Sequence, residues 1–396
     1  MGSAPSSLVG RRVGRYDVLE HVATGRLAEV LVARIVAGER DGRRVALKRI
    51  LPRFAKDPEV RSAVSAGVVA TSAQTADGGV HVEGVFEEDG ELLVEMELLE
   101  GATLASVLDR LRATDEVLGI ADVVAILATL ATTLTRLHAA TGADGSPLVH
   151  GGLGPPAVFV TEAGETKLLE LGVERALAVL DPDTRSGLIG PRAQYLSPEQ
   201  IGFRLIDGKA DVWSLGVTAW ELLTGRSLFG AETLLETLDR VRGAPVPRAS
   251  SVRADVPASL DRLIAEMLAR EAFDRPSMAH VAARLRDEVS PEVGAAKADL
   301  RATMVRLGLA ASAPRGLPTP SAGTRPPAVR APTPSAGLAI GGRTLGDAGP
   351  RSETFVVGAP PHGGSIARIA RDLLAIALGA AAGWLIVELV LRWTRG

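Results

Sequence analysis

The chain has 396 residues, of which 46% are hydrophobic and 23% are charged, and its formal net charge is −3. This length suits two or three domains of roughly 150 residues each, and the composition excludes a chain that is disordered throughout. The near balance of charge argues against a nucleic-acid partner, and the absence of cysteine excludes disulfide scaffolds, cysteine-ligated metal centres and thiol catalysis.

The first hundred residues are predicted to be strands with one helical stretch. Runs rich in β-branched residues predict strands over 16–22, 29–35, 44–50, 80–86 and 91–98, and residues 58–75 are compatible with a helix. After Gly101 the pattern becomes mainly helical. Apolar residues at helical spacing predict a helix over 120–140, which Gly142 stops. A small β-rich lobe therefore precedes a larger α-rich lobe, which is an α+β architecture.

The globular pattern ends near residue 289, and the composition then turns rich in Pro, Ala, Gly, Thr and Arg. Such a stretch buries too little apolar surface to offset its ordering entropy, so we expect a disordered linker over 290–365. Thr303 and Thr354 are predicted to be accessible within it. Phosphorylation there by another kinase would create a docking site for a phosphopeptide-reading domain, and the alternative is that both are ordinary linker residues.

Residues 366–391 are strongly apolar, and the run over 373–387 contains no charged residue. Counted from 373 through Leu391, a helix would be about 28 Å long, close to the hydrocarbon thickness of a bilayer, and arginines flank it on both sides. We therefore expect a single transmembrane helix followed by a short tail, 392–396. The alternative is a buried or surface-lying helix.

Two further expectations concern the predicted anchor. Gly379 and Gly383 have the spacing that lets two membrane helices approach closely, which would permit a homodimer. The N-terminus lacks the apolar run typical of a secretory signal. We therefore expect the globular region to lie in the cytoplasm, tethered to the cell membrane by the C-terminal helix.

Seven motifs in the globular region resemble, in order and spacing, those of bacterial serine/threonine protein kinases of the Hanks type. They are a glycine-loop remnant at 23–30, Val45-Ala46-Leu47-Lys48, a catalytic-loop equivalent at 150–157, a metal-site equivalent at 167–172, Ser197-Pro198-Glu199, a central-helix motif at 211–225, and Arg275-Pro276. The resemblance implies a two-lobed protein-kinase-like fold over 13–289, with an N-lobe over 13–100 and a C-lobe over 101–289. Residues 1–12 would form an N-terminal tail.

The resemblance also implies that the catalytic loop, which begins at His150, has lost its chemical groups. Gly152 stands where the family has the aspartate that accepts the substrate proton, and Gly154 replaces the lysine that steadies the transferring phosphate. Ala157 replaces the asparagine that holds a metal ion. Glu170 replaces the metal-binding aspartate and, being one methylene longer, would hold Mg²⁺ imperfectly.

The implied nucleotide site is partly retained. Its lysine is present as Lys48, but residues 61–76 contain no acidic partner for it, and Gly25 is the one glycine left of the three in the family's loop. The positions expected to contact adenine are Val30, Ala46, Val158 and the backbone of Glu97 and Leu99. ATP and Mg²⁺ are accordingly expected to bind weakly if at all, and no cofactor is required.

The family's scaffolding residues are present as Glu199, Asp211 and Arg275. A retained scaffold with lost chemistry is the pattern of a pseudokinase. We therefore expect a membrane-anchored signalling scaffold or regulator that binds other proteins, such as active kinases or phosphopeptide readers. Two alternatives stay open: an atypical active serine/threonine kinase that uses ATP, and a switch that binds ATP without catalysis.

Overall fold

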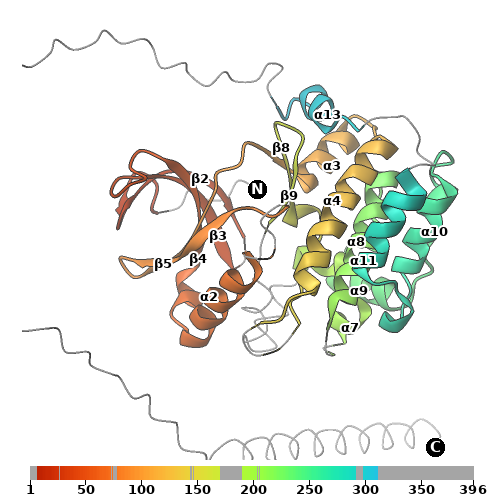
Figure 1. Cartoon of the computed structure of the whole chain (residues 1–396), viewed down its shortest axis with the longest axis horizontal. Helices are drawn as coiled ribbons and strands as arrows, with labels where there is room; N and C mark the ends of the chain where they lie inside the picture. The colour runs from red at the N-terminus through yellow and green to blue at the C-terminus, as the bar shows by residue number, and fades with distance from the viewer. Residues whose placement is uncertain are drawn as a thin grey trace, which may run out of the picture. The chain divides into compact units, whose positions relative to one another are not determined.

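Two lobes of different secondary structure follow one another along the chain (Figure 1). The computed structural model describes residues 7–25, 27–72, 74, 78–142, 145, 147–169, 190–202, 204, 206–290 and 298–310. Residues 1–6 of the predicted tail, most of the predicted linker, Thr354, the predicted membrane helix with Gly379 and Gly383, and Glu170 lie outside the described residues.

The N-lobe is built on an antiparallel sheet with the strand order β1-β2-β3-β4-β6-β5. The strands are β1 (Arg12–Val13), β2 (Tyr16–Thr24), β3 (Ala28–Ile35), β4 (Arg44–Ile50), β5 (Val82–Glu88) and β6 (Glu91–Met96). Strands that follow one another in the chain are joined by short connections, except that the helices α1 (Pro52–Ala55) and α2 (Pro58–Ser72) lie between β4 and β5.

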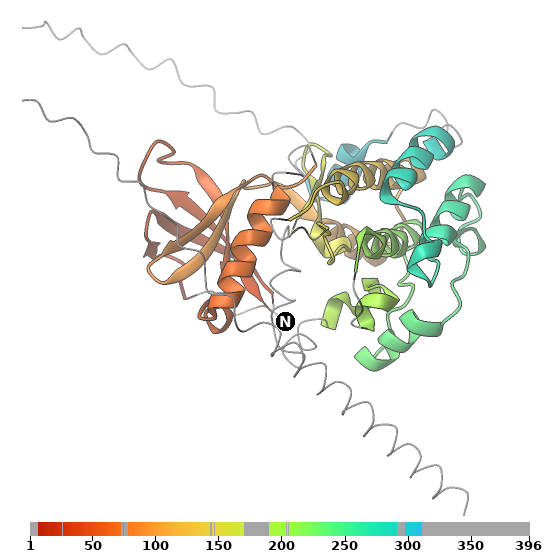
Figure 2. The ribbon, with the colours of Figure 1, turned by 60° about the horizontal axis from the view of Figure 1, so that its bottom comes forward.

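The two faces of this sheet bury different clusters. Residues opposite each other in an antiparallel ladder share a face, so Val30, Lys48 and Val94 lie side by side on one face. Helix α2 packs on that face through Val60, Val64 and Val68, which repeat every fourth residue (Figure 2). The other face carries a second cluster around Tyr16, Leu31, Leu47 and Leu93.

The C-lobe is mainly helical and carries a small three-stranded sheet with the order β7-β8-β9. Its strands are β7 (Gly101–Thr103), β8 (Val158–Thr161) and β9 (Thr166–Leu168). Its helices are α3 (Leu104–Ala113), α4 (Ile120–His138), α7 (Pro198–Ile201), α8 (Gly208–Thr224), α9 (Leu234–Gly243), α10 (Ala258–Met267), α11 (Met278–Arg284) and α13 (Leu300–Arg306). One apolar cluster runs through all of these layers.

Helix α8 is the buried centre of the C-lobe, with fifteen of its residues inside the protein. Gly216 permits a close approach by α10, because a Cβ there would lie 3.0 Å from the Cβ of Met267. The helix ends at Gly225, whose φ of 69° is the left-handed conformation that glycine adopts without strain. Trp213 stacks on Phe229, with ring centroids 5.6 Å apart.

A buried ion pair joins two distant parts of the C-lobe. The Arg275 guanidinium donates to both carboxylate oxygens of Glu199, over 2.7 and 2.9 Å. Its remaining donors bond the backbone carbonyls of Lys209, Arg270 and Ala269. The arginine is only 2% exposed, and this complete set of acceptors is what permits burial of its charge.

The predicted elements of both lobes are confirmed, with small differences at their ends. The predicted strand over 44–50 coincides with β4, and the predicted helix over 120–140 corresponds to α4. The predicted helix over 58–75 ends at Ser72. Among the described residues, α4 is the one helix long and apolar enough to cross a membrane, but 56% of its apolar window is buried in the C-lobe.

The predicted start of the linker at residue 290 is wrong for residues 298–310. These residues form α13 and its flanks, and Leu300, Met304 and Leu307 are buried in the C-lobe cluster. The prediction failed because the segment lies between stretches rich in Pro, Ala and Gly, and three apolar side chains on one short helix are a weak sequence signal. Thr303 is consequently buried, which contradicts its predicted accessibility.

The buried pair gives a test of the fold. Substituting Arg275→Leu leaves the Glu199 carboxylate buried without its partner, so the free energy of unfolding should fall by about 3–5 kcal/mol. Arg286→Leu is the matched control, because Arg286 pairs with Asp287 on the surface and should change stability little. Urea denaturation of the chain truncated after residue 310 measures both. Equal effects of the two substitutions would contradict the role assigned to Arg275.

Candidate active-site cleft

The Asp211 carboxylate, at the start of α8, holds the backbone of the catalytic-loop equivalent. Its oxygens accept hydrogen bonds from the amides of His150 and Gly151, over 2.9 and 2.8 Å. His138 Nε2, from the end of α4, donates to the same carboxylate over 2.8 Å. Gly151 has a φ of 69°, so the loop turns here in a conformation that favours glycine.

Burial and hydrogen bonding act in opposite directions on Asp211. Complete burial would raise the pKa of this carboxyl group, but the hydrogen bond and charge of His138, followed by the interactions with His150, outweigh it. The pKa of Asp211 therefore lies below its ordinary value. The group stays ionised and keeps accepting the three hydrogen bonds that shape the loop.

The position of the expected catalytic base is filled from another segment. Gly152 has no side chain, and a Cβ built on it would overlap the guanidinium of Arg192. Arg192 comes from the short helix η2 (Gly190–Tyr195), and its guanidinium donates to the carbonyl oxygen of Gly152 over 2.6 Å. A cation thus lies where the resemblance would place a carboxylate. It cannot accept a proton from a hydroxyl group.

Gly154 and Ala157 bring no polar side chain to the loop, and both lie against neighbouring parts of the protein. A Cβ on Gly154 would lie 3.0 Å from Cδ2 of Tyr195, so the tyrosine ring covers the place of the expected lysine. Burial, followed by the neighbouring Glu221 carboxylate, raises the pKa of Tyr195, whose hydroxyl donates to Glu221 over 2.5 Å. Ala157 is 2% exposed and offers a methyl group where a metal ligand would be needed.

The glycine-loop remnant forms a tight turn between β2 and β3. The Gly25 amide donates to the carbonyl of Ala28 over 2.8 Å. Leu27 turns inward and packs in the cluster that α2 covers, and its carbonyl accepts from the Leu51 amide. Because Leu27 is anchored in the lobe, this segment resembles a fixed hairpin more than a loop that closes over nucleotide phosphates.

The N-lobe residues predicted to bind a nucleotide share one face of the sheet. Lys48 on β4 is opposite Val30 on β3, and Ala46 is opposite Val32. Lys48 is half-buried there. Helix α2, which would supply its acidic partner, has Glu59 as its one acidic residue, in the first turn and exposed.

The hinge between the lobes follows β6. The Glu97 amide donates to the carbonyl of His81 over 2.9 Å, and the Glu97 carboxylate accepts from the His81 amide over 2.7 Å. Lys167 Nζ lies 3.9 Å from this carboxylate. Leu99 is half-buried further along. One side of the hinge backbone is thus already paired within the protein.

The structure corrects one predicted slot residue. Val158 is 0% exposed and belongs to the apolar cluster of the C-lobe. Successive residues of a strand face opposite sides, so its neighbour Phe159, which is partly exposed, faces away from that cluster. Phe159 is therefore the residue of β8 that could line the base of an adenine site. The apolar sequence of β8 did not show which of its residues faces the C-lobe cluster and which faces away from it.

The described residues do not fit a bound Mg²⁺. Among them, no group of three or more His, Asp or Glu side chains could hold a metal ion. Ala157 supplies no ligand, and Glu170 lies outside the described residues.

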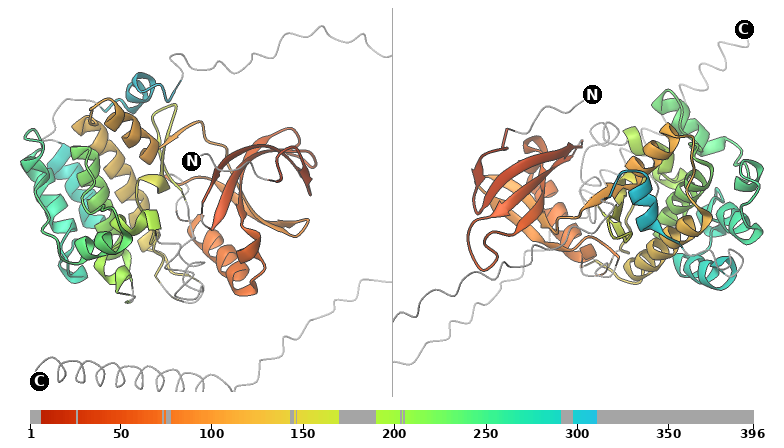
Figure 3. Two further views of the ribbon diagram at one scale, coloured as in Figure 1. Left: turned by 180° about the vertical axis from the view of Figure 1, so that it is seen from behind. Right: turned by 90° about the horizontal axis from the view of Figure 1, so that it is seen from above.

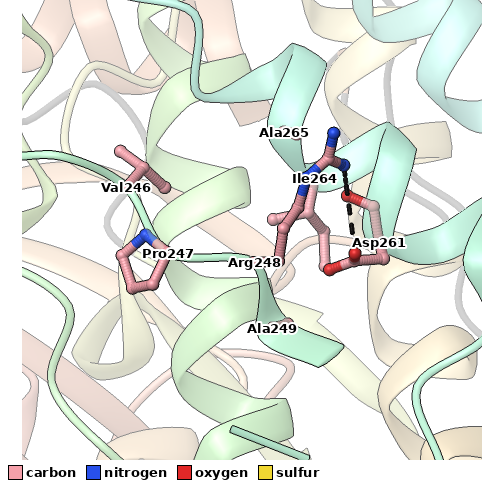
Figure 4. A pocket seen from close by; sticks show the side chains of 7 residues that line it. All are labelled: Val246, Pro247, Arg248, Ala249, Asp261, Ile264 and Ala265. Carbon is pink, nitrogen blue, oxygen red and sulfur yellow. Dashed lines mark hydrogen bonds and ion pairs between the residues drawn. The ribbon is translucent and has the colours of Figure 1, made fainter. Parts of the chain in front are cut away.

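A separate pocket of about 100 Å³ lies on the C-lobe between η3 (Ala249–Ser251) and α10, where Arg248 donates to the carbonyl of Asp261 (Figure 4). It contains none of the residues that the sequence analysis singled out.

Several residues of the site were not predicted. Arg192 and Tyr195 belong to no motif, and their roles depend on the two glycines that they cover. Gln200 Nε2 donates to the carbonyl of Gly151 over 2.6 Å and adds a second support to the loop. His138 had a signal, since it is a polar residue at the end of an apolar helix.

Comparison with known proteins identifies the family of this chain. Residues 16–284 match the protein kinase domain family. The chain belongs to the protein kinase family. Among bacterial relatives, serine/threonine-protein kinase PknL of Mycobacterium tuberculosis is 35% identical over 264 residues, which are 66% of this chain and 62% of PknL. Serine/threonine-protein kinase PknH of Mycobacterium bovis is 26% identical and aligns with 97% of this chain and 66% of PknH. The expected membership of the bacterial Hanks-type kinase family is confirmed.

Other relatives agree on the fold and differ in length. Tyrosine-protein kinase MasK of Myxococcus xanthus is 25% identical, and the chain covers 41% of its length. The chain thus spans about 40 to 60% of the length of MasK and PknL. The crystal structure of the Mycobacterium tuberculosis PknI kinase domain matches 72% of this chain and all of that domain, with a TM-score of 0.55 and 23% identity. This likeness shows the protein-kinase fold.

The lowered pKa of Asp211 predicts a pH-dependent effect of Asp211→Asn. An asparagine offers one oxygen to three donors, so the free energy of unfolding should fall by about 1–3 kcal/mol at pH 7. The carboxylate contributes stability above its unfolded pKa, near 3.8, and loses it as pH falls through the lower folded pKa. The difference between the two proteins should therefore shrink below about pH 4. Urea denaturation from pH 7 to 3 measures it, and a difference that grows toward low pH would contradict the assignment.

Proposed function

We propose that this chain is a pseudokinase, a protein-kinase fold that acts by binding signalling proteins and does not transfer phosphate. The apolar segment 366–391 would anchor it in the cell membrane with the kinase-like region in the cytoplasm. Its partners would be other signalling proteins, active kinases among them. The similarity to proteins named as kinases supports the fold that this proposal assumes. The geometry of the cleft supports the proposed absence of phosphotransfer.

The observation that carries the proposal is the guanidinium of Arg192 beside Gly152. Phosphoryl transfer to a hydroxyl group needs a carboxylate that orients the hydroxyl and accepts its proton. No Asp or Glu occurs between Pro147 and Val160, so no neighbour in the loop can substitute. The cation next to Gly152 would also repel Mg²⁺ and raise the cost of bringing a proton to this place.

The rest of the C-lobe supports a binding role. The Glu199–Arg275 pair and the Asp211 hydrogen bonds keep the loop and the helices ordered although the loop itself carries no carboxylate. A surface that is held rigid presents a partner with a preformed shape and limits the entropy lost on association. The ordered C-lobe is thus useful without turnover.

A second candidate is a switch that binds ATP without catalysis. Lys48 on the same sheet face as Val30 and Ala46 favours it, because a cation beside an apolar slot suits a nucleotide. The tight Gly25 turn and the paired hinge amide of Glu97 disfavour it. The two candidates differ in whether nucleotide stabilises the fold.

Thermal unfolding with millimolar ATP, with and without Mg²⁺ or Mn²⁺, distinguishes them. A ligand at a hundred times its Kd stabilises by about 2.7 kcal/mol. For a domain of this size that is a shift in Tm of roughly 5–10 °C. We expect no shift for the chain truncated after residue 310, and the same curve for Lys48→Ala. A shift that needs a divalent ion and disappears in Lys48→Ala would contradict the scaffold and favour a kinase or a switch.

A further inference from the structure

Helix α13 docks on the C-lobe beside the three-stranded sheet. It lies next to β8 and the N-terminal part of α4, far along the chain from both (Figure 3). Leu300, Met304 and Leu307 are buried in the main apolar cluster of the lobe. Arg301 bonds the carbonyl of Glu162 over 2.9 Å, and Arg306 pairs with Glu116 at the rim.

One buried carboxylate fixes this docked position. Asp122, in the first turn of α4, is 7% exposed. Its Oδ1 accepts from the amide of Asp299 and its Oδ2 from the hydroxyl of Thr303, both over 2.8 Å. Both donors are uncharged. The start and the middle of α13 thus depend on one negative charge.

Thr303 is the sensitive member of this contact. Its side chain is 9% exposed, and its hydroxyl lies at hydrogen-bonding distance from Asp122. A negative group at this position would face the Asp122 carboxylate where little water screens the two charges. Docking and a negative charge at residue 303 are therefore incompatible.

We propose that residues 298–310 form a latch on the C-lobe, and that a phosphoryl group on Thr303 holds this latch in its released state. An active serine/threonine kinase would transfer the γ-phosphoryl group of ATP. The bond from the γ-phosphorus to ADP breaks, a bond to Thr303 Oγ1 forms, and the hydroxyl proton goes to the base of that kinase. Because the docked hydroxyl is buried, transfer occurs in the undocked state, and the product cannot dock again. Modification therefore traps the released latch.

Undocking of α13 would affect the cleft through β8 and the strands beside it. The Gly164 turn between β8 and β9 lies against α13, since a Cβ on Gly164 would be 2.7 Å from the Arg301 amide nitrogen. Strand β8 directly follows the catalytic-loop equivalent, and its partner β7 follows the hinge. Undocking removes one support from this sheet and frees residues 298–310 from the C-lobe.

Hydrogen exchange of the full chain in mild detergent tests the latch with a matched pair of variants. Thr303→Asp and Thr303→Asn have the same shape and differ in charge, and the asparagine amide can still donate to Asp122. The amides of 303–309 should lose about tenfold or more of their protection in Thr303→Asp relative to Thr303→Asn. Equal exchange in the two variants would overturn the proposal.

A second substitution separates charge from shape. In the double variant Asp122→Asn with Thr303→Asp, the repulsion is gone and the asparagine amide can donate to the new carboxylate, so protection should return to within about threefold of Thr303→Asn. A double variant that exchanges as fast as Thr303→Asp would also overturn the latch. Both results leave the proposed lack of phosphotransfer untouched, because neither measurement depends on the cleft chemistry.

Discussion

The carboxylate of Asp211 is the interaction on which the site depends. It is fully buried at the start of the central helix and accepts hydrogen bonds from two loop amides and from His138. These bonds fix the left-handed turn at Gly151 and so determine where Gly152 and Gly154 lie. An ionised group survives in this interior because its partners donate to it from three directions. The shape of the loop therefore depends on Asp211 and not on the side chains that the loop itself carries.

Side chains from a neighbouring segment occupy the spaces beside the two loop glycines. Arg192 fills the space beside Gly152 and bonds its carbonyl, and the ring of Tyr195 covers Gly154. Both come from η2, the segment just before the retained Ser197-Pro198-Glu199 motif. The described part of the loop is thus packed by side chains of its own chain, so a larger residue at either glycine would have to displace them. An aspartate side chain at position 152 would contact the guanidinium of Arg192 and would not be free to contact a substrate.

Sequence patterns were sufficient for the architecture and for the retained scaffold. Strands such as β4 and the helix α4 follow from local periodicity, and the Glu199–Arg275 pair follows from family motifs with a clear register. The parts that were missed depend on contacts between distant residues. Arg192 acquires its place only because a glycine lies opposite, α13 is ordered by the distant Asp122, and the inward direction of Val158 depends on which face of β8 meets the helices. No local pattern encodes such pairings.

Phosphotransfer under single-turnover conditions tests the central claim most directly. The full chain, in excess over radiolabelled ATP with Mg²⁺ or Mn²⁺ and a general serine/threonine substrate, is compared with Lys48→Ala. The account predicts no labelled product above that of Lys48→Ala, either on the substrate or on the chain itself, because the described residues place the guanidinium of Arg192, and no carboxylate, beside Gly152. Labelled product that depends on Lys48 would contradict the account and would show that this fold transfers phosphate without the base that its family uses.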